Sequence, residues 1–193
     1  PTRIKRQNVK RSKAKAGLMP LTKANLPDNA SALMQLNAAS CGFAPASARH
    51  VDLLQNGAAT YAALETAIAS ATHHIHLEYY IFEPDISGIR IRDALTHAAR
   101  RGIEVRLLLD RLGSKNINDA FLSPLKDAGA QIAFFHPFRF KHIWQPRFNL
   151  RTHRKIVVID GSAGFTGGIN ITDAQNDALR DDAARRFITL VDE

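Results

Sequence analysis

The chain has little of what several protein classes need. Its single cysteine, Cys41, excludes an intramolecular disulfide, and no cluster of cysteine and histidine has the spacing of zinc ligands. No run of about 18 apolar residues occurs, so no transmembrane helix is expected within these 193 residues. A hydrophobic content of 45% is nevertheless enough for one globular domain with a substantial core, which excludes disorder throughout.

Acidic residues are almost absent from the first 50 positions, which hold nine Lys and Arg residues and the one acid Asp28. The rest of the chain holds 17 of each sign, so the net charge of +8 comes from this leading segment. A polybasic stretch gains about 1 kcal/mol per residue near an anionic membrane surface. A solvated tail and a nucleic-acid-binding tail are the alternatives. Because residues 1–48 show no sustained periodicity, we interpret them as a basic, irregular N-terminal extension.

The segment from residue 128 to residue 159 has no acid at all. It interleaves six Lys and Arg residues with six aromatic residues. This mixture suits a phosphate head group with its acyl chains, single-stranded nucleic acid, or an ordinary hydrophobic loop between strands. The positive charge of this segment excludes a cationic substrate.

Strand and helix patterns alternate along residues 49–193. Apolar side chains recur at helical spacing in residues 57–72, 87–101 and 114–128. Strand patterns occupy residues 74–83, 103–110 and 131–136. This alternation predicts an α/β fold with a mainly parallel or mixed sheet flanked by helices.

A further strand is predicted at residues 155–160, because this stretch is rich in β-branched side chains. Successive side chains of a strand point to opposite faces, so His153 and Lys155 share one face. Asp160-Gly161 predicts a two-residue hairpin turn, which would place His153 opposite Gly168. A longer loop would move this register by one or two residues.

The returning half of the hairpin adds two features to the same end of the strand. Glycine at 167 and 168 leaves room for a phosphate to approach the backbone. Asn170, just beyond, can donate an amide hydrogen bond to phosphate oxygens. An imidazole, an ammonium and an amide are therefore expected to gather around a phosphate.

These residues form the pattern His-x-Lys-x4-Asp-x6-Gly-Gly-x-Asn, which resembles the signature of the phospholipase D superfamily. The usual form of that signature has Gly-Ser where this chain has Gly167-Gly168. Residues 76–84, 102–110 and 149–161 resemble the bacterial cardiolipin synthases, and the similarity, which runs from about residue 50 to about residue 175, is with the N-terminal half of such enzymes. Residues 49–193 are thus expected to be a phospholipase D-like domain with one motif copy.

The resemblance implies a phosphoryl transfer in two steps, through a phosphohistidine and without a metal or other cofactor. His153 is then the nucleophile, and Lys155 and Asn170 bind the phosphate, roles that suit a neutral imidazole, a cation and an amide donor. Asp160 belongs to the catalytic motif, but we interpret it as structural, since it closes the strand and can bind turn amides. The expected substrate contacts are Gly167, Gly168 and Arg151.

The family's site needs two motifs placed face to face, and this chain has one. None of the other seven histidines has a lysine two residues further on. We therefore expect the second motif from a missing half of a longer protein, or from a second copy in a symmetric dimer. A carboxylate that orients the catalytic histidine is expected beyond Asn170, with Asp181 and Asp182 as candidates.

The function predicted from the resemblance is a phosphatidyltransferase that makes cardiolipin from phosphatidylglycerol. A phosphodiesterase, either a phospholipase D or a dimeric single-motif nuclease, and an inactive half domain are the alternatives. The expected partners are an anionic phospholipid, a membrane surface, and a second motif-bearing domain or homodimer partner; nucleic acid is the competing ligand. The expected location is the bacterial inner membrane, as a peripheral protein on the cytoplasmic side or through segments outside this chain.

The sequence contains three further candidate sites. His73, His74 and His76 form a cluster near a strand start, which we interpret as packed side chains and not as a metal site. Glu78, a charged residue in an apolar strand, is expected to pair with a basic residue near the motif. Asp110 ends a buried strand, where it could serve a functional loop or cap the following turn.

Overall fold

The computed structural model describes residues 28–42, 48–135 and 152–179. The chain divides into two compact units, one ending at Leu53 and the other starting at Leu54. In the described part of the first unit, Asp28–Cys41 forms helix α1, which differs from the irregular extension predicted for residues 1–48. Its Leu33 and Leu36 are each 65% exposed, so the helix follows from the propensity of its Ala, Leu, Met and Gln residues and not from an apolar stripe.

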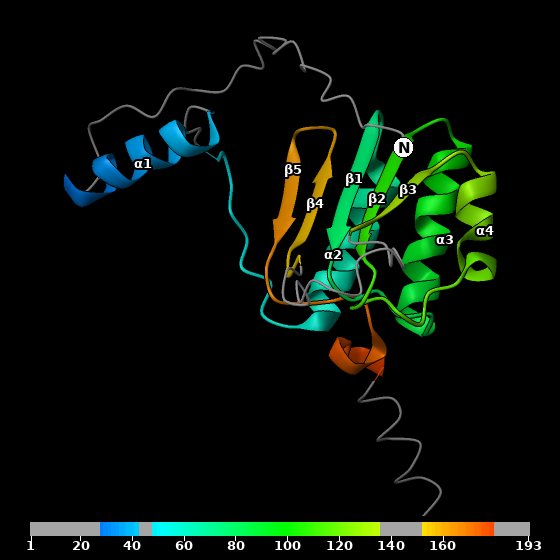
Figure 1. The fold of residues 1–193 in the computed structure, drawn as a ribbon. Helices are drawn as coiled ribbons and strands as arrows, with labels where there is room; N and C mark the ends of the chain where they lie inside the picture. The colour runs from blue at the N-terminus through cyan, green and yellow to red at the C-terminus, as the bar shows by residue number, and fades with distance from the viewer. Residues whose placement is uncertain (1–27, 43–47, 136–151, 180–193) are drawn as a thin grey trace, which may run out of the picture. The chain divides into compact units, whose positions relative to one another are not determined.

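The second unit is built on one five-stranded sheet with the order β3-β2-β1-β4-β5 (Figure 1). Strands β1, β2 and β3 are parallel, whereas β4 is antiparallel to both of its neighbours. The predicted mixed α/β sheet is therefore confirmed. The strands are β1 (His74–Tyr79), β2 (Glu104–Asp110), β3 (Gln131–Phe135), β4 (Lys155–Ile159) and β5 (Ala163–Thr166).

Three helices connect or precede the parallel strands: α2 (Gly57–Ser70), α3 (Ile86–Arg100) and α4 (Asp119–Asp127). Each begins after a residue whose side chain accepts a backbone N–H of the first turn, namely Asn56, Asp85 and Asn118. The predicted start of α4 at residue 114 was too early. Ser114 is fully buried and uses its hydroxyl to accept the Phe82 N–H, so it belongs to the turn between β2 and α4.

The core lies on one face of the sheet, against α2, α3 and α4 (Figure 1). Alternation along the strands sends every second side chain into this core. The opposite face carries His74, His76 and Glu78 of β1, which are half-buried, and Arg106 of β2, which is exposed. The buried strand residues are Ile75, Leu77, Tyr79, Val105, Leu107, Leu109, Val157 and Ile159, together with Asp110 at the end of β2 and Lys155 at the start of β4.

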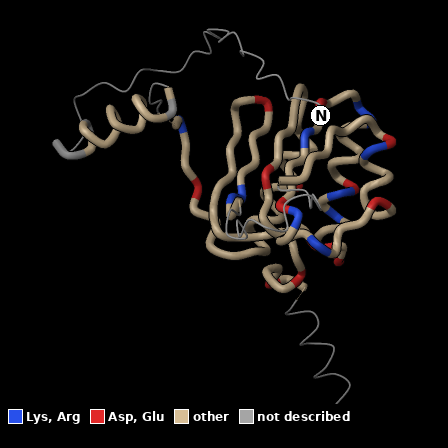
Figure 2. The backbone as a smooth tube through the Cα atoms, in the orientation of Figure 1, with Lys and Arg blue, Asp and Glu red and all other residues tan. Residues whose placement is uncertain are grey.

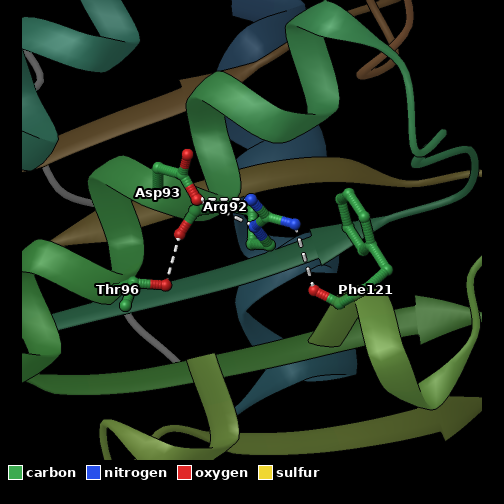
Figure 3. A network of polar contacts seen from close by, with 4 residues as sticks. All are labelled: Arg92, Asp93, Thr96 and Phe121. Carbon is green, nitrogen blue, oxygen red and sulfur yellow. Dashed lines mark hydrogen bonds and ion pairs between the residues drawn. The ribbon is translucent and has the colours of Figure 1, made fainter. Parts of the chain in front are cut away.

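A polar network fastens α3 to α4 (Figure 3). Arg92 binds Asp93 at 2.7 Å and donates to the Phe121 carbonyl at 3.4 Å, and its guanidinium lies 4.7 Å from the centre of the Phe121 ring. The Thr96 hydroxyl donates to the Arg92 carbonyl at 2.8 Å. These contacts join α3 to α4 and involve no residue of the motif.

The hairpin between β4 and β5 differs by one residue from the predicted two-residue turn. Ile159 pairs with Ala163, so the loop has three residues, Asp160 to Ser162. Asp160 and Gly161 both adopt positive φ, at 54° and 65°, as in the tight turns that join twisted strands. Extended to the motif, this register sets His153 level with Ile169, one position beyond the predicted Gly168.

None of the helices within the described ranges combines the length and apolar character needed to cross a lipid bilayer.

Candidate functional site

The motif lies at one edge of the sheet, where the parallel strands end. Tyr79, the last residue of β1, pairs with Lys155, the first residue of β4, and also with Leu109 near the end of β2. His153, two residues before the start of β4, therefore lies at the same edge of the sheet as the carboxyl ends of β1 and β2. This is the edge at which open α/β sheets place their ligands.

The structure brings His153 and Lys155 together, as strand alternation predicts. The Lys155 Nζ lies 3.2 Å from His153 Nδ1 and 3.3 Å from Nε2, and donates to the His153 carbonyl at 3.1 Å. Lys155 is only 5% exposed, and this desolvation lowers the pKa of its ammonium. A cation held against the imidazole is placed to stabilise charge on a group that the imidazole attacks.

Tyr80 supplies an aromatic wall to the same corner. Its ring centre lies 4.8 Å from that of His153, with the planes at 50°, and 5.5 Å from the Lys155 Nζ. No local sequence pattern predicts a role for Tyr80. The pairing of Tyr79 with Lys155 places Tyr80 beside the motif, and this pairing can be recognised only once β1 and β4 are known to be neighbours.

Asn170 is anchored in this corner by its backbone and by its side-chain oxygen. It is 6% exposed, and its Oδ1 accepts the N–H of Ile81, the residue after Tyr80, at 3.3 Å. Its carbonyl accepts the Tyr61 hydroxyl at 2.6 Å, and its N–H donates to Gln175. With Oδ1 engaged, Nδ2 is the end of the amide that can donate to a ligand.

Tyr61 is a second residue whose role no local sequence pattern predicts. Its hydroxyl also accepts the Thr172 N–H at 2.8 Å, so one phenol on α2 holds the backbone on both sides of Ile171. Burial raises the pKa of Tyr61 to about 12, which keeps the phenol neutral and able to donate. The helix pattern of α2 predicted only that Tyr61 would be in the core.

Thr152, just before the motif histidine, is bound by two carboxylates. Its hydroxyl donates to Glu78 Oε1 at 2.5 Å, and its N–H donates to Asp110 Oδ2 at 3.2 Å. The basic partner predicted for Glu78 is present, since Arg154 Nη1 lies 3.6 Å from the same Oε1. The alternative of Asp110 as a turn cap also agrees with the structure, because its Oδ1 accepts the N–H groups of residues 112 and 113.

Asp160 lies at the other end of β4 from His153. Its carboxylate accepts the N–H groups of Thr72, His73 and His74, and the Thr72 hydroxyl, all within 2.9 Å. These hydrogen bonds hold its pKa well below the usual range. The amides belong to the start of β1 and not to its own turn, so Asp160 joins β4 to β1. This geometry accounts for the residue by folding alone.

The remaining predicted contacts divide into two groups. A Cβ added at Gly167 or Gly168 would meet no described residue within 4 Å, so the backbone there borders open space within the described part of the chain. Arg151, Asp181, Asp182 and residues 136–151 of the basic and aromatic segment lie outside the described residues.

The histidine cluster packs as a row of rings. His73 and His74 approach to 2.9 Å through their Nδ1 atoms, and the rings of His74 and His76 are 4.9 Å apart. The His76 Nε2 lies 3.5 Å from Glu104 Oε1. Among the described residues, no group of three or more His, Cys, Asp or Glu side chains is arranged to hold a metal ion.

Among the described residues, the positive charge at this corner comes from Arg154 and Lys155 and not from a general excess. Acidic and basic residues are interspersed along the described backbone of the second unit (Figure 2). Together the corner offers an imidazole, a buried ammonium and an amide donor. This is the chemistry needed to bind and attack a phosphodiester.

The chain belongs to the phospholipase D-like family. Residues 64–184 match the family model described as "Cardiolipin synthase, PLD-like domain". Cardiolipin synthase 1 of Bacillus cereus is 46% identical over 121 residues, which are 63% of this chain and 24% of that protein. A cardiolipin synthase of a Geobacillus species is 41% identical over 142 residues, which are 73% of this chain and 28% of that protein. The chain thus spans about a quarter of the length of the curated relatives it matches.

Among solved structures, the phospholipase D family member Nuc from Salmonella typhimurium is 24% identical, with a TM-score of 0.46, over 62% of this chain and 68% of that one. NucT from Helicobacter pylori is 17% identical, with a TM-score of 0.43, over 67% of this chain and 86% of that one.

Proposed function

We propose that the complete protein is a phosphatidyltransferase that makes cardiolipin from phosphatidylglycerol, and that this chain carries its nucleophile. One observation carries the proposal: the buried Lys155 ammonium lies against the His153 imidazole in a domain that matches the cardiolipin synthase family model. The 46% identity to a cardiolipin synthase supports the choice of substrate.

In the first step, a ring nitrogen of His153 attacks the phosphorus of phosphatidylglycerol. A phosphorus–nitrogen bond forms, the bond to the glycerol head group breaks, and a second histidine protonates the departing alkoxide. Lys155 and Asn170 hold the phosphate oxygens while negative charge builds on them. In the second step, a hydroxyl of another phosphatidylglycerol attacks the phosphohistidine, gives its proton to the second histidine, and restores the His153 imidazole.

The second histidine comes from outside this chain's single motif, either from another part of a longer protein or from a second copy. The polybasic first 15 residues support a peripheral location at an anionic membrane, where the lipid substrate resides.

The test is to incubate the complete protein with labelled phosphatidylglycerol, and separately with single-stranded DNA, and to identify the products by mass spectrometry. Cardiolipin and glycerol are expected from the parent. His153→Ala should form neither, whereas His97→Ala, which removes an exposed histidine of α3, should match the parent. Phosphatidic acid as the product in place of cardiolipin would indicate hydrolysis and not transfer. Cleaved DNA would indicate a nuclease. Parent-like turnover by His153→Ala would refute the role of His153.

A further inference from the structure

The two residues that flank His153 are bound by the same carboxylate oxygen. Glu78 Oε1 accepts the Thr152 hydroxyl at 2.5 Å and lies 3.6 Å from Arg154 Nη1. Thr152 is 7% exposed and the Glu78 side chain 20%, so the shorter of these contacts is largely screened from water. Water therefore competes weakly for the Thr152 hydroxyl.

Because side chains alternate along a strand, the contacts of Glu78 with Thr152 and Arg154 also determine the direction in which His153 points. Glu78 pairs with Ile156, so both point to the sheet face opposite the core, and the side chains of 154 and 152 follow the same alternation. His153, between them, points to the other side, where it meets Tyr80 and Lys155. Holding 152 and 154 on one face thus turns 153 toward the other.

Asp110 fixes the backbone of the same residue. Its Oδ2 accepts the Thr152 N–H, and its Oδ1 accepts the N–H groups of Leu112 and Gly113. Asp110 is 2% exposed, and its carboxylate accepts hydrogen bonds from three backbone donors, two of them from its own turn. Asp110 therefore connects the backbone at Thr152, just before His153, to the end of β2, the strand that neighbours β1 on the side away from β4.

We propose that Glu78 and Asp110 are positioning residues, which clamp Thr152 and so set the orientation of the His153 imidazole for attack. Neither carboxylate bonds to the imidazole, so each acts through Thr152 or Arg154. The inference rests on the proposed function for its kinetic consequence, but the orientation itself is measurable without turnover.

A matched pair of substitutions separates the hydroxyl from the shape of the side chain. In the complete protein, Thr152→Val keeps the β-branched volume and the backbone N–H but removes the hydroxyl, whereas Thr152→Ser keeps the hydroxyl. Thr152→Val should lower kcat by roughly tenfold to a hundredfold with the KM for phosphatidylglycerol unchanged, because small misplacements of reacting groups have effects of this size. Thr152→Ser should retain most of the parent kcat. Thr66→Val, which removes a hydroxyl hydrogen bond of 2.8 Å on α2, is the remote control.

The second readout is the NMR spectrum of histidine-labelled protein, with the His153 resonances assigned by their loss in His153→Ala. They should shift in Thr152→Val and stay in place in Thr152→Ser and Thr66→Val. If Thr152→Val does not fold, Glu78→Gln replaces it, with the same two readouts and the same directions.

Parent-like kcat and unshifted His153 resonances in Thr152→Val would overturn the clamp, as would an equal loss of kcat in Thr152→Ser. A parent that turns over neither lipid nor DNA would refute the proposed function instead. The clamp would then still be judged by the His153 resonances.

Discussion

The two ends of β4 carry charged residues of one motif and use them differently. At the Asp160 end, the carboxylate accepts four hydrogen bonds from Thr72, His73 and His74. At the other end, the Lys155 ammonium is buried against His153, and no acidic residue within the described ranges pairs with it. An Asp with four local donors is accounted for by folding, whereas a buried cation beside an imidazole is costly unless a ligand uses it. A shared motif does not imply a shared role.

The largest effect is expected from Lys155→Ala in the complete protein. Loss of the cation beside His153 should reduce turnover by about 10²- to 10³-fold, as removal of a charge-stabilising donor commonly does, while the fold stays intact. The control is Lys126→Ala, which removes an exposed lysine of α4 that binds Asp119. Steady-state kinetics and circular dichroism measure the two properties, and equal turnover in both variants would remove Lys155 from the site.

Asp160→Asn should act on stability and leave the kinetics unchanged. Asn tolerates the positive φ of this position but is a weaker acceptor than a carboxylate, so the midpoint of thermal unfolding should fall by several degrees at pH 7. The hydrogen bonds depress the folded pKa of Asp160, so its contribution is present above the unfolded pKa of about 3.9 and is lost as the pH falls below it. The parent and the variant should therefore converge in acid. A large loss of kcat in folded Asp160→Asn would break the contrast between the two ends.

Tyr80→Ala should lower kcat by about threefold to tenfold. This range corresponds to the interaction free energy of an aromatic pair, which is the kind of contact that the Tyr80 ring makes with His153. Tyr80→Phe keeps the ring and should retain most of the activity. Equal losses in the two variants would show that the hydroxyl, and not the stacked ring, is what matters at this position.

Glycine substitutions give the smallest effect and test the contrast at the backbone. Gly168→Ser, at the His153 end, should leave stability near the parent value, because an added Cβ meets open space among the described residues. Gly161→Ala, at the Asp160 end, should lower the free energy of unfolding by about 1–2 kcal/mol, because this residue has a φ of 65°. Denaturant titration measures both, and a strong loss of stability in Gly168→Ser would contradict the geometry.

Local rules were enough to predict part of this site. Alternation along one strand brings His153 and Lys155 together, and the strand and helix patterns give the mixed α/β sheet. The hairpin register was one residue off, because Asp160-Gly161 predicts the turn chemistry but not the third loop residue. Tyr80, Tyr61 and Thr152 were missed because their contacts depend on pairing between segments some 70 to 110 residues apart, which no local pattern encodes.

The helix α1 shows the opposite limit. Its residues have helical propensity but no apolar stripe, and a periodicity argument detects buried faces and not propensity. The predicted boundary between residues 48 and 49, and the roles of Arg151, Asp181 and Asp182, stay predictions.

The most direct test of the central claim is to trap the covalent intermediate. The complete protein, mixed with phosphatidylglycerol, then denatured and digested near neutral pH, should yield a peptide whose mass is raised by one phosphatidyl group attached to His153. Alkali should remove the two acyl chains of the adduct but leave its phosphorus–nitrogen bond, acid should cleave that bond, and the adduct should be absent from His153→Ala. An adduct on another residue, or cardiolipin formed at the parent rate by His153→Ala, would contradict the account.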